Sequence, residues 1–417
     1  MNKSALVISF DLFREGEADV SYAVASLMSY LKKDNRYGNE FTVKNLSINM
    51  LSHPNELTDN YLNSILLEHL IWNFDTIAIS CYVWNEYLIN PLIKKIFALG
   101  FHGKIVLGGY QISYGTKEKL SKEYPQADIF IFGYAEKSLL DSIFLKTSNL
   151  PIYLNENVDF FDLPSPYLSN EIIVSKNQKM VRMETKRGCP YKCSFCSHRD
   201  LTKNKVHKHN KNKVFEELDF FKEKQVQKIN ILDPVFNGGK DCLDYLKYMC
   251  EIGLKSEITM QTRFEMIKGE LGKSFLDLSE KLHSKLEFGV QTVISKEYNA
   301  IRRPNDLNII KNLLLELKNR NISYEVSLIY GLPYQTYDSF MKSVDFFLLN
   351  GCKNLTAFPL MLLKGTELYQ QKEEFNFVEE EIGDFKIPTV ISSNSFTNKE
   401  WIKMDNVAKQ LNPNQRL

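Results

Sequence analysis

The chain alternates short apolar runs with helix-length amphipathic stretches over most of its 417 residues, and this alternation restricts its fold more than any other feature. In the first 145 residues, runs such as "SALVISF" and "TIAISCYVW" are each followed by a stretch with helical periodicity. Alternating strands and helices are typical of α/β proteins with parallel sheets. We therefore expect a Rossmann-like, doubly wound domain over residues 1–145.

The alternation stops over residues 146–180, which carry Pro151, Pro164 and Pro166. Proline interrupts helices and favours extended chain, so we expect an inter-domain linker here. Over residues 181–370 the alternation resumes with six strand-like runs, and a helix-length segment follows each of the first five. This pattern predicts a partial (β/α)6 barrel with its active site at the carboxyl ends of the strands. Residues 371–417 are too irregular to assign and are expected to form a short C-terminal tail.

Composition excludes several classes of protein. The 52 Lys and Arg residues nearly balance the 51 Asp and Glu residues, so we expect no nucleic-acid partner. The apolar run at the N-terminus is too short for a signal peptide, and a span of about 18 apolar residues is absent from the sequence, so we expect a cytoplasmic protein without a membrane span. The odd count of seven cysteines favours metal ligands or free thiols over a disulfide framework.

Small and polar residues follow three of the strands predicted in the N-terminal domain. In an open parallel sheet, ligands bind beyond the carboxyl ends of the strands, and glycine there lets a ligand approach the backbone closely. The alternative is that the paired glycines only form a tight turn between strand and helix. The candidate binding residues are Ser80, Tyr82, Gly108, Gly109, Gly133, Ala135 and Glu136.

Three cysteines follow the first predicted barrel strand. Cys189, Cys193 and Cys196 have the spacing C-x3-C-x2-C. A compact loop with three thiolates can bind three irons of a 4Fe-4S cluster and leave the fourth iron open to another ligand. A tetrahedral zinc site is the alternative, because His198 could supply the fourth ligand. The other cysteines stand far apart and are expected to be small buried hydrophobic residues.

The segment "RGCPYKCSFC" resembles the signature loop of radical S-adenosylmethionine (SAM) enzymes, with Phe195 in the aromatic position before the last cysteine. This resemblance implies that the three cysteines hold a 4Fe-4S cluster and that SAM chelates the open iron. It also implies reductive cleavage of SAM to methionine and a 5′-deoxyadenosyl radical. An electron donor such as flavodoxin or ferredoxin and sensitivity to oxygen are implied as well.

Four more segments resemble the segments at the second, fourth, fifth and sixth strands of the same family: "LDPVFN", "EFGVQTVISKEYNAIRRPND", "LIYGLPYQT" and "LMLLKGTELY". By this comparison, polar residues at the strand ends hold the polar parts of SAM. A carboxylate suits the ammonium group of SAM, and the guanidinium fork of Arg suits its carboxylate. The candidates are Asp233, Arg263, Gln291 and Arg303.

The N-terminal segments "ISCYVWN", "IVLGGYQIS" and "IFGYAE" resemble the strand ends of the cobalamin-binding domain that is fused to one branch of these enzymes. The resemblance implies that the strand-end candidates named above bind cobalamin. Tyr110 stands where that branch usually has Pro, and "GYAE" keeps only the outer residues of "GEGE". The sequence has no D-x-H-x-x-G motif to supply a lower cobalt ligand, and radical enzymes of this branch commonly lack it.

The resemblance implies a cobalamin-dependent radical SAM enzyme, and we expect a methyltransferase that acts on an unactivated carbon of a small-molecule metabolite or a peptide. The alternatives are a rearrangement, cyclisation or dehydrogenation enzyme that uses cobalamin or has lost it. A non-catalytic metal-binding module is a further alternative. One fold supports many reactions, so the site must decide among them.

Overall fold

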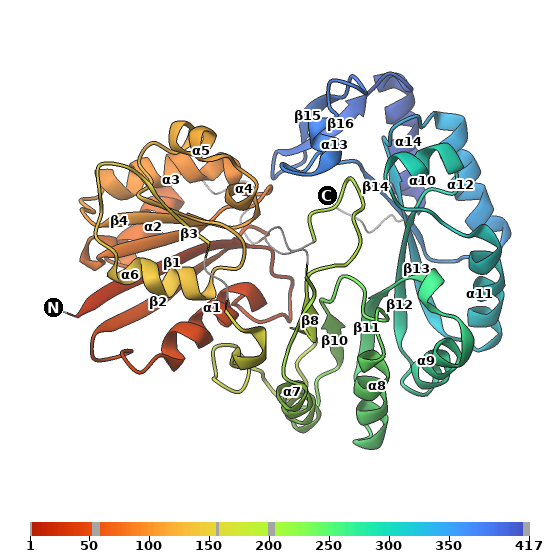
Figure 1. Ribbon diagram of the computed structural model, residues 1–417, viewed down its shortest axis with the longest axis horizontal. Coiled ribbons are helices and arrows are strands. Elements are labelled where there is room, and N and C mark those ends of the chain that lie inside the picture. Colours follow the sequence, from red (N-terminus) through yellow and green to blue (C-terminus); the bar gives the residue numbers. More distant parts are fainter. Residues whose placement is uncertain (1, 52–58, 156–157, 199–204, 412–417) are drawn as a thin grey trace. The chain divides into compact units, whose positions relative to one another are not determined.

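The computed structural model describes residues 2–51, 59–155, 158–198 and 205–411. The chain divides into two compact units, one of residues 1–175 with 384–386 and the other of residues 176–383 with 387–417. Each unit is built around its own parallel sheet of six strands (Figure 1). Among the described helices, none has both the length and the apolar character that crossing a membrane requires.

The sheet of the first unit has the strand order β2-β1-β3-β4-β5-β6, and its neighbouring strands run parallel. Because β1 lies between β2 and β3, the connections change direction there, which places a topological switch point between the carboxyl ends of β1 and β3. The elements are β1 (Lys3–Asp11), α1 (Tyr22–Lys33), β2 (Phe41–Asn49), α2 (Asp59–Glu68), β3 (Thr76–Ser80), α3 (Glu86–Ala98), β4 (Lys104–Gly108), α4 (Tyr110–Ser113), α5 (Lys117–Glu123), β5 (Ile129–Ile131), α6 (Glu136–Phe144) and β6 (Ile152–Leu154).

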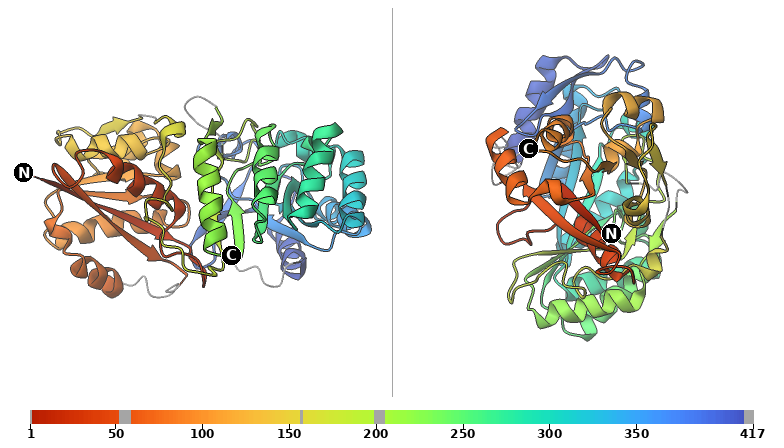
Figure 2. Two further views of the ribbon diagram at one scale, coloured as in Figure 1. Left: turned by 90° about the horizontal axis from the view of Figure 1, so that it is seen from below. Right: turned by 90° about the vertical axis from the view of Figure 1, so that its left-hand side faces the viewer.

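Helices cover both faces of this sheet. Alternate residues of a strand point to opposite faces. Ala5 and Val7 of β1 join a buried core to which α1 contributes Met28 and α6 contributes Leu140. Leu6, which lies between them in the strand, is fully buried and points to the other face. The doubly wound arrangement is therefore the one that the apolar runs predict, and Figure 2 shows the first unit from two further sides.

The sheet of the second unit has the order β14-β13-β12-β11-β10-β7, with all neighbouring strands parallel and with β7 and β14 at its edges. It is an open barrel of six strands, and the expected partial (β/α)6 fold is confirmed. The strands are β7 (Val181–Met183), β10 (Lys228–Ile231), β11 (Glu257–Thr262), β12 (Lys285–Gln291), β13 (Ser323–Tyr330) and β14 (Leu355–Pro359). The helices are α7 (Lys211–Glu223), α8 (Asp241–Glu251), α9 (Gly269–Lys281), α10 (Ser295–Ala300), α11 (Leu307–Asn319), α12 (Tyr337–Leu349) and α13 (Glu367–Gln370).

Residues 146–175 do not form the linker that their prolines predict. They belong to the first unit, and β6 within them pairs with β5 at the edge of its sheet. Pro151 directly precedes β6, where a missing N–H does not interrupt the pairing of an edge strand. Tyr167 further anchors the segment, because its side chain is 2% exposed. The boundary between the units therefore falls at residue 175, near the end of the expected linker.

The C-terminal segment is folded and is more than the short tail expected. β15 (Val378–Ile382) and β16 (Ile387–Ser392) form an antiparallel hairpin, and α14 (Asn398–Leu411) follows. The hydroxyl of Tyr330 on β13 donates to Asp405 Oδ1 of α14 at 2.8 Å, and the ring of Tyr330 lies 5.8 Å from that of Trp401. The helix therefore packs against the barrel and extends its core.

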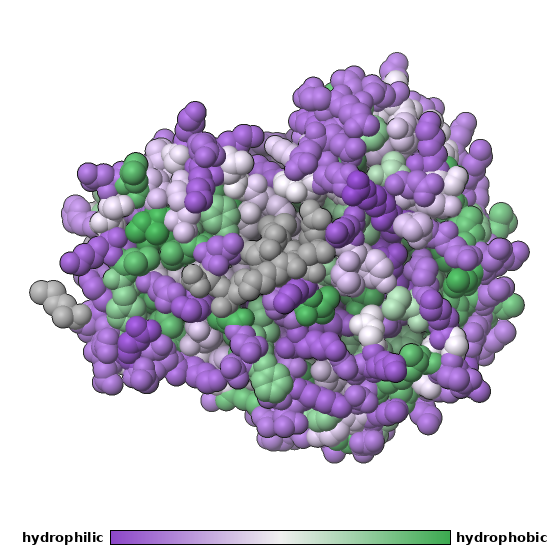
Figure 3. Space-filling view, in the orientation of Figure 1, coloured by the Kyte–Doolittle hydropathy of each residue, from purple (hydrophilic) through white to green (hydrophobic). Residues whose placement is uncertain are grey.

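The exposed residues include charges of both signs. Hydrophilic residues predominate on the face shown in Figure 3, with hydrophobic residues scattered among them. Arg320, for example, forms ion pairs with Asp277 at 2.7 Å and with Glu280 at 3.2 Å. This mixture agrees with the formal net charge of +1.

Candidate active site

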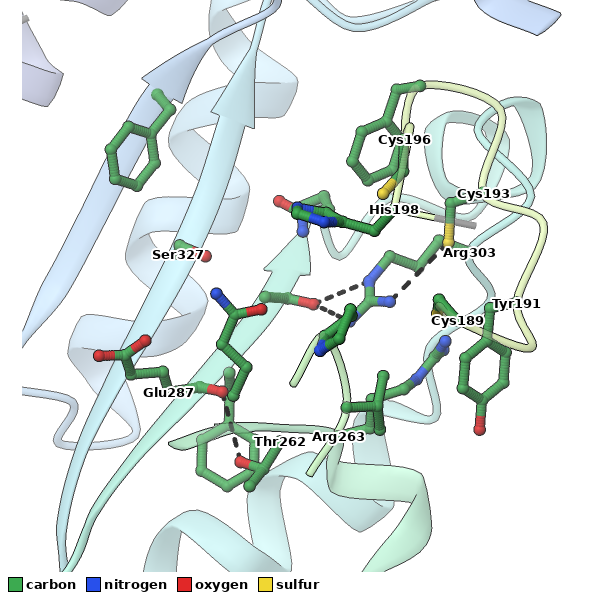
Figure 4. A pocket seen from close by; sticks show the side chains of 18 of the residues that line it. Cys189, Tyr191, Cys193, Cys196, His198, Thr262, Arg263, Glu287, Arg303 and Ser327 are labelled. Carbon is green, nitrogen blue, oxygen red and sulfur yellow. Dashed lines mark hydrogen bonds between the residues drawn. The ribbon is translucent and has the colours of Figure 1, made fainter. Parts of the chain in front are cut away.

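A cavity of about 340 Å³ lies within the second unit, and residues from the cysteine loop and from strands β11 to β14 line it. Figure 4 shows Cys189, Cys193 and Cys196 on one side of the cavity and Glu287 and Ser327 on the opposite side. The ends of the strands and the loops that follow them thus line the cavity, as expected for a barrel of this kind.

Backbone hydrogen bonds fix the loop that carries the three cysteines. The amide of Ser194 donates to the carbonyl of Ile301 at 3.0 Å, and the carbonyl of Ser194 accepts from the amide of Leu368 at 2.9 Å. The hydroxyl of Ser194 also donates to the carbonyl of Ala300 at 3.2 Å. The loop is therefore held from both sides by segments that follow β12 and β14.

Burial raises the pKa of two of the thiols. It raises the pKa of Cys189, and it raises the pKa of Cys196 to about 11. A coordinated metal removes the proton from a thiol. Arg263 and Arg303 lie in the same cavity and lower the pKa of Cys189 against the effect of burial. The three thiols therefore suit a metal centre with a net negative charge, and Arg263 and Arg303 are the cations beside it.

Among the described residues, no three His, Cys, Asp or Glu side chains converge closely enough to hold a single metal ion. His198 does line the cavity together with the cysteines, and burial lowers its pKa. His198 therefore forms part of the cavity wall.

Arg263, Gln291 and Arg303 all reach the cavity, and so does Phe195. The guanidinium of Arg263 lies 3.8 Å from the centre of the Tyr191 ring, and its Nε lies 3.3 Å from Glu265 Oε2. Gln291 has a φ of 75° and follows a register shift between β12 and β13. A local bulge of this kind redirects a side chain and is common beside active sites.

Asp233 does not reach the cavity, contrary to the expectation from the sequence. Its carboxylate is fully buried and accepts hydrogen bonds from the amide of Thr185 at 2.8 Å and from the amide of Lys186 at 3.2 Å. The hydroxyl of Thr185 donates to it as well. Asp233 therefore links the end of β10 to the segment after β7. The following residues, Pro234 and Val235, line the cavity in its place.

The wall opposite the cysteines carries polar residues that the sequence analysis did not single out. Glu287 on β12 and Glu325 on β13 are register partners and both line the cavity. Lys285 Nζ lies 2.7 Å from Glu325 Oε2, whereas burial and the charge of Glu325 raise the pKa of Glu287. Polar residues at every second position of "KLEFGVQ" and "SYEVSLIY" are the signal that could have identified this wall.

The strand-end candidates of the first unit lie at the carboxyl edge of its sheet. Ser80 ends β3 and Gly108 ends β4, and these two residues are register partners. Tyr82 stacks on Trp84, with ring centres 4.6 Å apart. Gly109 has a φ of 100°, and a Cβ there would lie 2.5 Å from a backbone oxygen of Cys81, so this position requires glycine.

The residues after β5 divide between this edge and the core. Gly133 lies two residues after β5 and has a φ of 73°, and its amide donates to the hydroxyl of Ser113 at 3.0 Å. Ala135 is the N-cap of α6. Glu136 is only 2% exposed and accepts a hydrogen bond from the hydroxyl of Ser26 at 3.3 Å. Its side chain therefore points into the core, contrary to the binding role expected for it.

A partial (β/α)6 barrel with three closely spaced cysteines on the loop after its first strand is the arrangement of a radical SAM domain. Residues 183–347 match the model of the radical SAM superfamily. The match confirms the resemblance carried by "RGCPYKCSFC".

Two methyltransferases are similar in sequence to this chain. The chain is 24% identical over 330 residues to the cobalamin-dependent radical SAM methyltransferase TokK of Streptomyces tokunonensis, which corresponds to 70% of this chain and 48% of TokK. It is 22% identical over 306 residues to the 2-(S-pantetheinyl)-carbapenam-3-carboxylate methyltransferase of Streptantibioticus cattleyicolor, or 65% of this chain and 44% of that enzyme. The chain thus spans about half the length of these relatives.

A solved structure shares the fold. The radical SAM methyltransferase TsrM of Kitasatospora setae, with cobalamin and a 4Fe-4S cluster bound, matches with a TM-score of 0.72 and 12% identity. The match covers 99% of this chain and 89% of that one. At this identity the likeness concerns the fold, and it confirms the α/β fold class predicted from the strand–helix alternation.

Proposed function

We propose that the chain is a cobalamin-dependent radical SAM enzyme and that Cys189, Cys193 and Cys196 bind a 4Fe-4S cluster. The observation that carries the proposal is the cavity itself, in which the three cysteines share one wall with Arg263 and Arg303. Each thiolate binds a different iron of such a cluster, and the fourth iron is left for SAM. Cations beside the thiols offset the negative charge of a cluster.

The residues that line the cavity suit SAM in part. Arg263 offers a planar fork to a carboxylate, Gln291 offers an amide, and Phe195 offers an aromatic surface. Asp233 is left out of this set, because its carboxylate is already occupied by hydrogen bonds from Thr185 and Lys186. When bound, the cluster supplies the electron that cleaves SAM to a 5′-deoxyadenosyl radical, and cobalamin supplies the methyl group.

For cobalamin, we propose the carboxyl edge of the first sheet. Gly108 and Gly109 remove side chains where the backbone would meet the ligand, and Tyr82 with Trp84 forms a stacked aromatic surface beside them. Ser80, Gly133 and Ala135 border the same edge, whereas Glu136 is excluded by its burial. The edge contains the switch point where doubly wound sheets bind ligands. The similarity to TokK, which is named as cobalamin-dependent, supports the assignment.

The reaction we propose is transfer of a methyl group to an unactivated carbon of a small molecule or peptide. The substrate would lie against the wall of Glu287, Glu325 and Ser327, across the cavity from the cysteines. A flavodoxin or ferredoxin would supply the electron. The chain has seven free cysteines, and its proposed cluster is sensitive to oxygen, both of which suit the reducing cytoplasm.

Two products test the proposal without knowledge of the substrate. Anaerobically reconstituted protein is incubated with SAM, dithionite and reduced cobalamin. We expect 5′-deoxyadenosine, which requires the cluster, and S-adenosylhomocysteine, which requires transfer of methyl to cobalamin. Omitting cobalamin should abolish the second product and leave the first unchanged.

Other outcomes of this experiment would favour the alternative functions. Formation of 5′-deoxyadenosine without any cobalamin-dependent S-adenosylhomocysteine would overturn methyl transfer and favour dehydrogenation, cyclisation or rearrangement. Absence of both products, in protein that contains the cluster and binds SAM, would favour a non-catalytic module. SAM labelled with CD3 would then distinguish methyl gain from hydrogen loss by the mass of a product formed in a cell extract.

A further inference from the structure

The side chain of Arg303 is fixed by two contacts inside the cavity. Its Nε donates to the carbonyl of Gly289 at 2.8 Å, and Nη2 donates to the same oxygen. Its Nη1 points to Cys193 Sγ at 3.9 Å (Figure 4). The guanidinium therefore bridges the bulge of β12 and one of the three proposed cluster ligands.

The backbone keeps Arg303 and Cys193 together. The amide of Arg303 donates to the carbonyl of Tyr298 at 2.9 Å, which anchors the residue to α10. Ser194, next to Cys193, bonds to the carbonyls of Ala300 and Ile301 at the end of the same helix. The arginine and the cysteine loop thus form one hydrogen-bonded unit, and their distance does not depend on a flexible connection.

Gly289 lets the side chain of Gln291 lie close to the backbone beside Arg303. A Cβ at this position would lie 2.7 Å from Gln291 Nε2, whereas its distance of 3.8 Å to Arg303 Nη2 is an ordinary contact. A larger residue would therefore displace the amide of Gln291 and leave room for the guanidinium of Arg303. The glycine of the "EFGVQ" segment is explained by the approach of Gln291.

Arg303 forms no ion pair within the part of the chain that the structure describes. Burial and the charge of Arg263 lower its pKa, whereas Cys193 and the more distant Glu265 raise it. Glu265 itself pairs with Arg263, at 3.3 Å. The thiol of Cys193, whose Sγ lies 3.9 Å from Arg303 Nη1, becomes anionic once a metal binds it and would then place a negative charge beside the guanidinium.

We infer that Arg303 is a positioning residue that raises the reduction potential of the cluster through its N–H···S contact to Cys193. This inference rests on the proposed function. Hydrogen bonds to cysteine sulfur and nearby positive charge both stabilise the reduced cluster, which carries one more negative charge. The role differs from the family-based expectation that Arg303 binds SAM, because its Nε and Nη2 already donate to Gly289 and its Nη1 is directed at sulfur.

The test compares three variants of the full chain, each anaerobically reconstituted. Arg303→Gln removes the charge, and Arg303→Lys keeps the charge but loses the planar fork. Arg302→Gln is the matched control, because it removes the same charge from the neighbouring residue. The side chain of Arg302 is 58% exposed and pairs with Glu367 at 2.6 Å. The midpoint potential of the cluster is measured by an electron paramagnetic resonance titration without SAM. The dissociation constant of SAM is measured by anaerobic equilibrium dialysis.

We expect Arg303→Gln to shift the midpoint potential to a more negative value, Arg303→Lys to shift it less, and Arg302→Gln to leave it unchanged. SAM should bind to all three with an affinity within about threefold of the wild type, below the tenfold change that ~1.4 kcal/mol produces. An unchanged potential in Arg303→Gln, combined with a loss of SAM affinity greater than about tenfold, would overturn the inference and restore the SAM-binding role.

The remaining outcomes are also decisive. If neither Arg303 variant assembles a cluster while Arg302→Gln does, Arg303 is required for assembly and the tuning role is wrong. If the wild type itself assembles no four-iron cluster, the proposed function fails together with this inference. If the wild type assembles the cluster and Arg303→Gln has the same midpoint potential, this inference alone is overturned.

Discussion

Asp233 binds Thr185 with both of its carboxylate oxygens: Oδ1 accepts from the backbone amide at 2.8 Å, and Oδ2 accepts from the hydroxyl. The two residues follow β10 and β7, which are neighbouring strands. Thr185 also lies four residues before Cys189 on the segment that leads into the cysteine loop. The pair therefore fixes the base of the proposed cluster site without touching the cavity.

We predict that Asp233→Ala destabilises the fold and leaves SAM affinity intact. The change leaves several buried N–H and O–H donors without an acceptor, which costs roughly 2–4 kcal/mol in the free energy of unfolding. Urea denaturation of the metal-free protein measures the loss, and equilibrium dialysis of reconstituted protein measures SAM binding. Wild-type stability with a tenfold loss of SAM affinity would instead return Asp233 to the role that the sequence predicted.

The pKa of Asp233 predicts a pH dependence of stability. Burial raises it from the ordinary value of 3.8 to about 6. Because the folded state holds the proton more tightly, the associated stability is fully present below the unfolded pKa and is lost as the pH rises through the folded pKa. Between pH ~4 and ~6, the free energy of unfolding of the wild type should therefore fall by roughly 2–3 kcal/mol relative to Asp233→Asn. Parallel curves for the two proteins would show that the carboxylate is ionised throughout.

Gly331 begins the "GLP" turn after β13, and we predict that Gly331→Val lowers stability and activity together. Its φ is 92°, and a Cβ would lie 3.4 Å from the Cβ of Leu360 and 3.5 Å from a backbone oxygen of Val390. A β-branched residue in this conformation costs roughly 1–3 kcal/mol. Thermal unfolding and 5′-deoxyadenosine formation are the two measurements. Selective loss of turnover at normal thermal stability would assign the turn a catalytic role.

At the carboxyl edge of the first sheet, we predict that Gly108→Trp abolishes cobalamin binding and preserves the iron–sulfur absorption. A Cβ at Gly108 would make only ordinary contact, at 3.7 Å from Ile131, so the fold should accept a side chain that extends into the proposed cobalamin site. Gly108→Ala is the control and should fold and bind cobalamin. Absorption spectra of anaerobically purified proteins check both. Tight cobalamin binding by Gly108→Trp would show that the corrin binds elsewhere. If the wild type does not bind added cobalamin, cobalamin is no longer part of the proposed function.

The strands and helices could be predicted because short-range periodicity determines which residues are buried. The six barrel strands lie where the apolar runs lie, and the cysteines meet at one cavity because a loop of eight residues cannot separate them far. β6 and the C-terminal hairpin were missed, because strands of three to six residues beside prolines and turns give too little periodicity to detect.

Side-chain direction could not be predicted from strand-end position alone. Asp233 and Arg263 both follow barrel strands, yet the first points into the interior and the second into the cavity. Glu136 likewise turned inward, because Ser26 on α1 offers a hydrogen bond there. The pairing of Glu287 with Glu325 depends on the register of two strands that lie 38 residues apart, which no local pattern reveals.

The cysteines provide the sharpest test of catalysis. Changing any one of Cys189, Cys193 or Cys196 to Ala should abolish formation of 5′-deoxyadenosine, because each holds a separate iron. The fold should persist, since the loop lies at the barrel mouth and contributes little to the core. Circular dichroism of the metal-free variants checks the fold. Full SAM cleavage by a single variant would show that its cysteine is not a ligand.

The central claim is that these three cysteines hold a four-iron cluster, and the iron content after anaerobic reconstitution tests it most directly. Mössbauer spectra and metal analysis of the wild type should give about four irons per chain in a 4Fe-4S cluster. The triple Ala variant of Cys189, Cys193 and Cys196 should bind none. Stoichiometric zinc in the wild type, or about four irons retained by the triple variant, would contradict the claim.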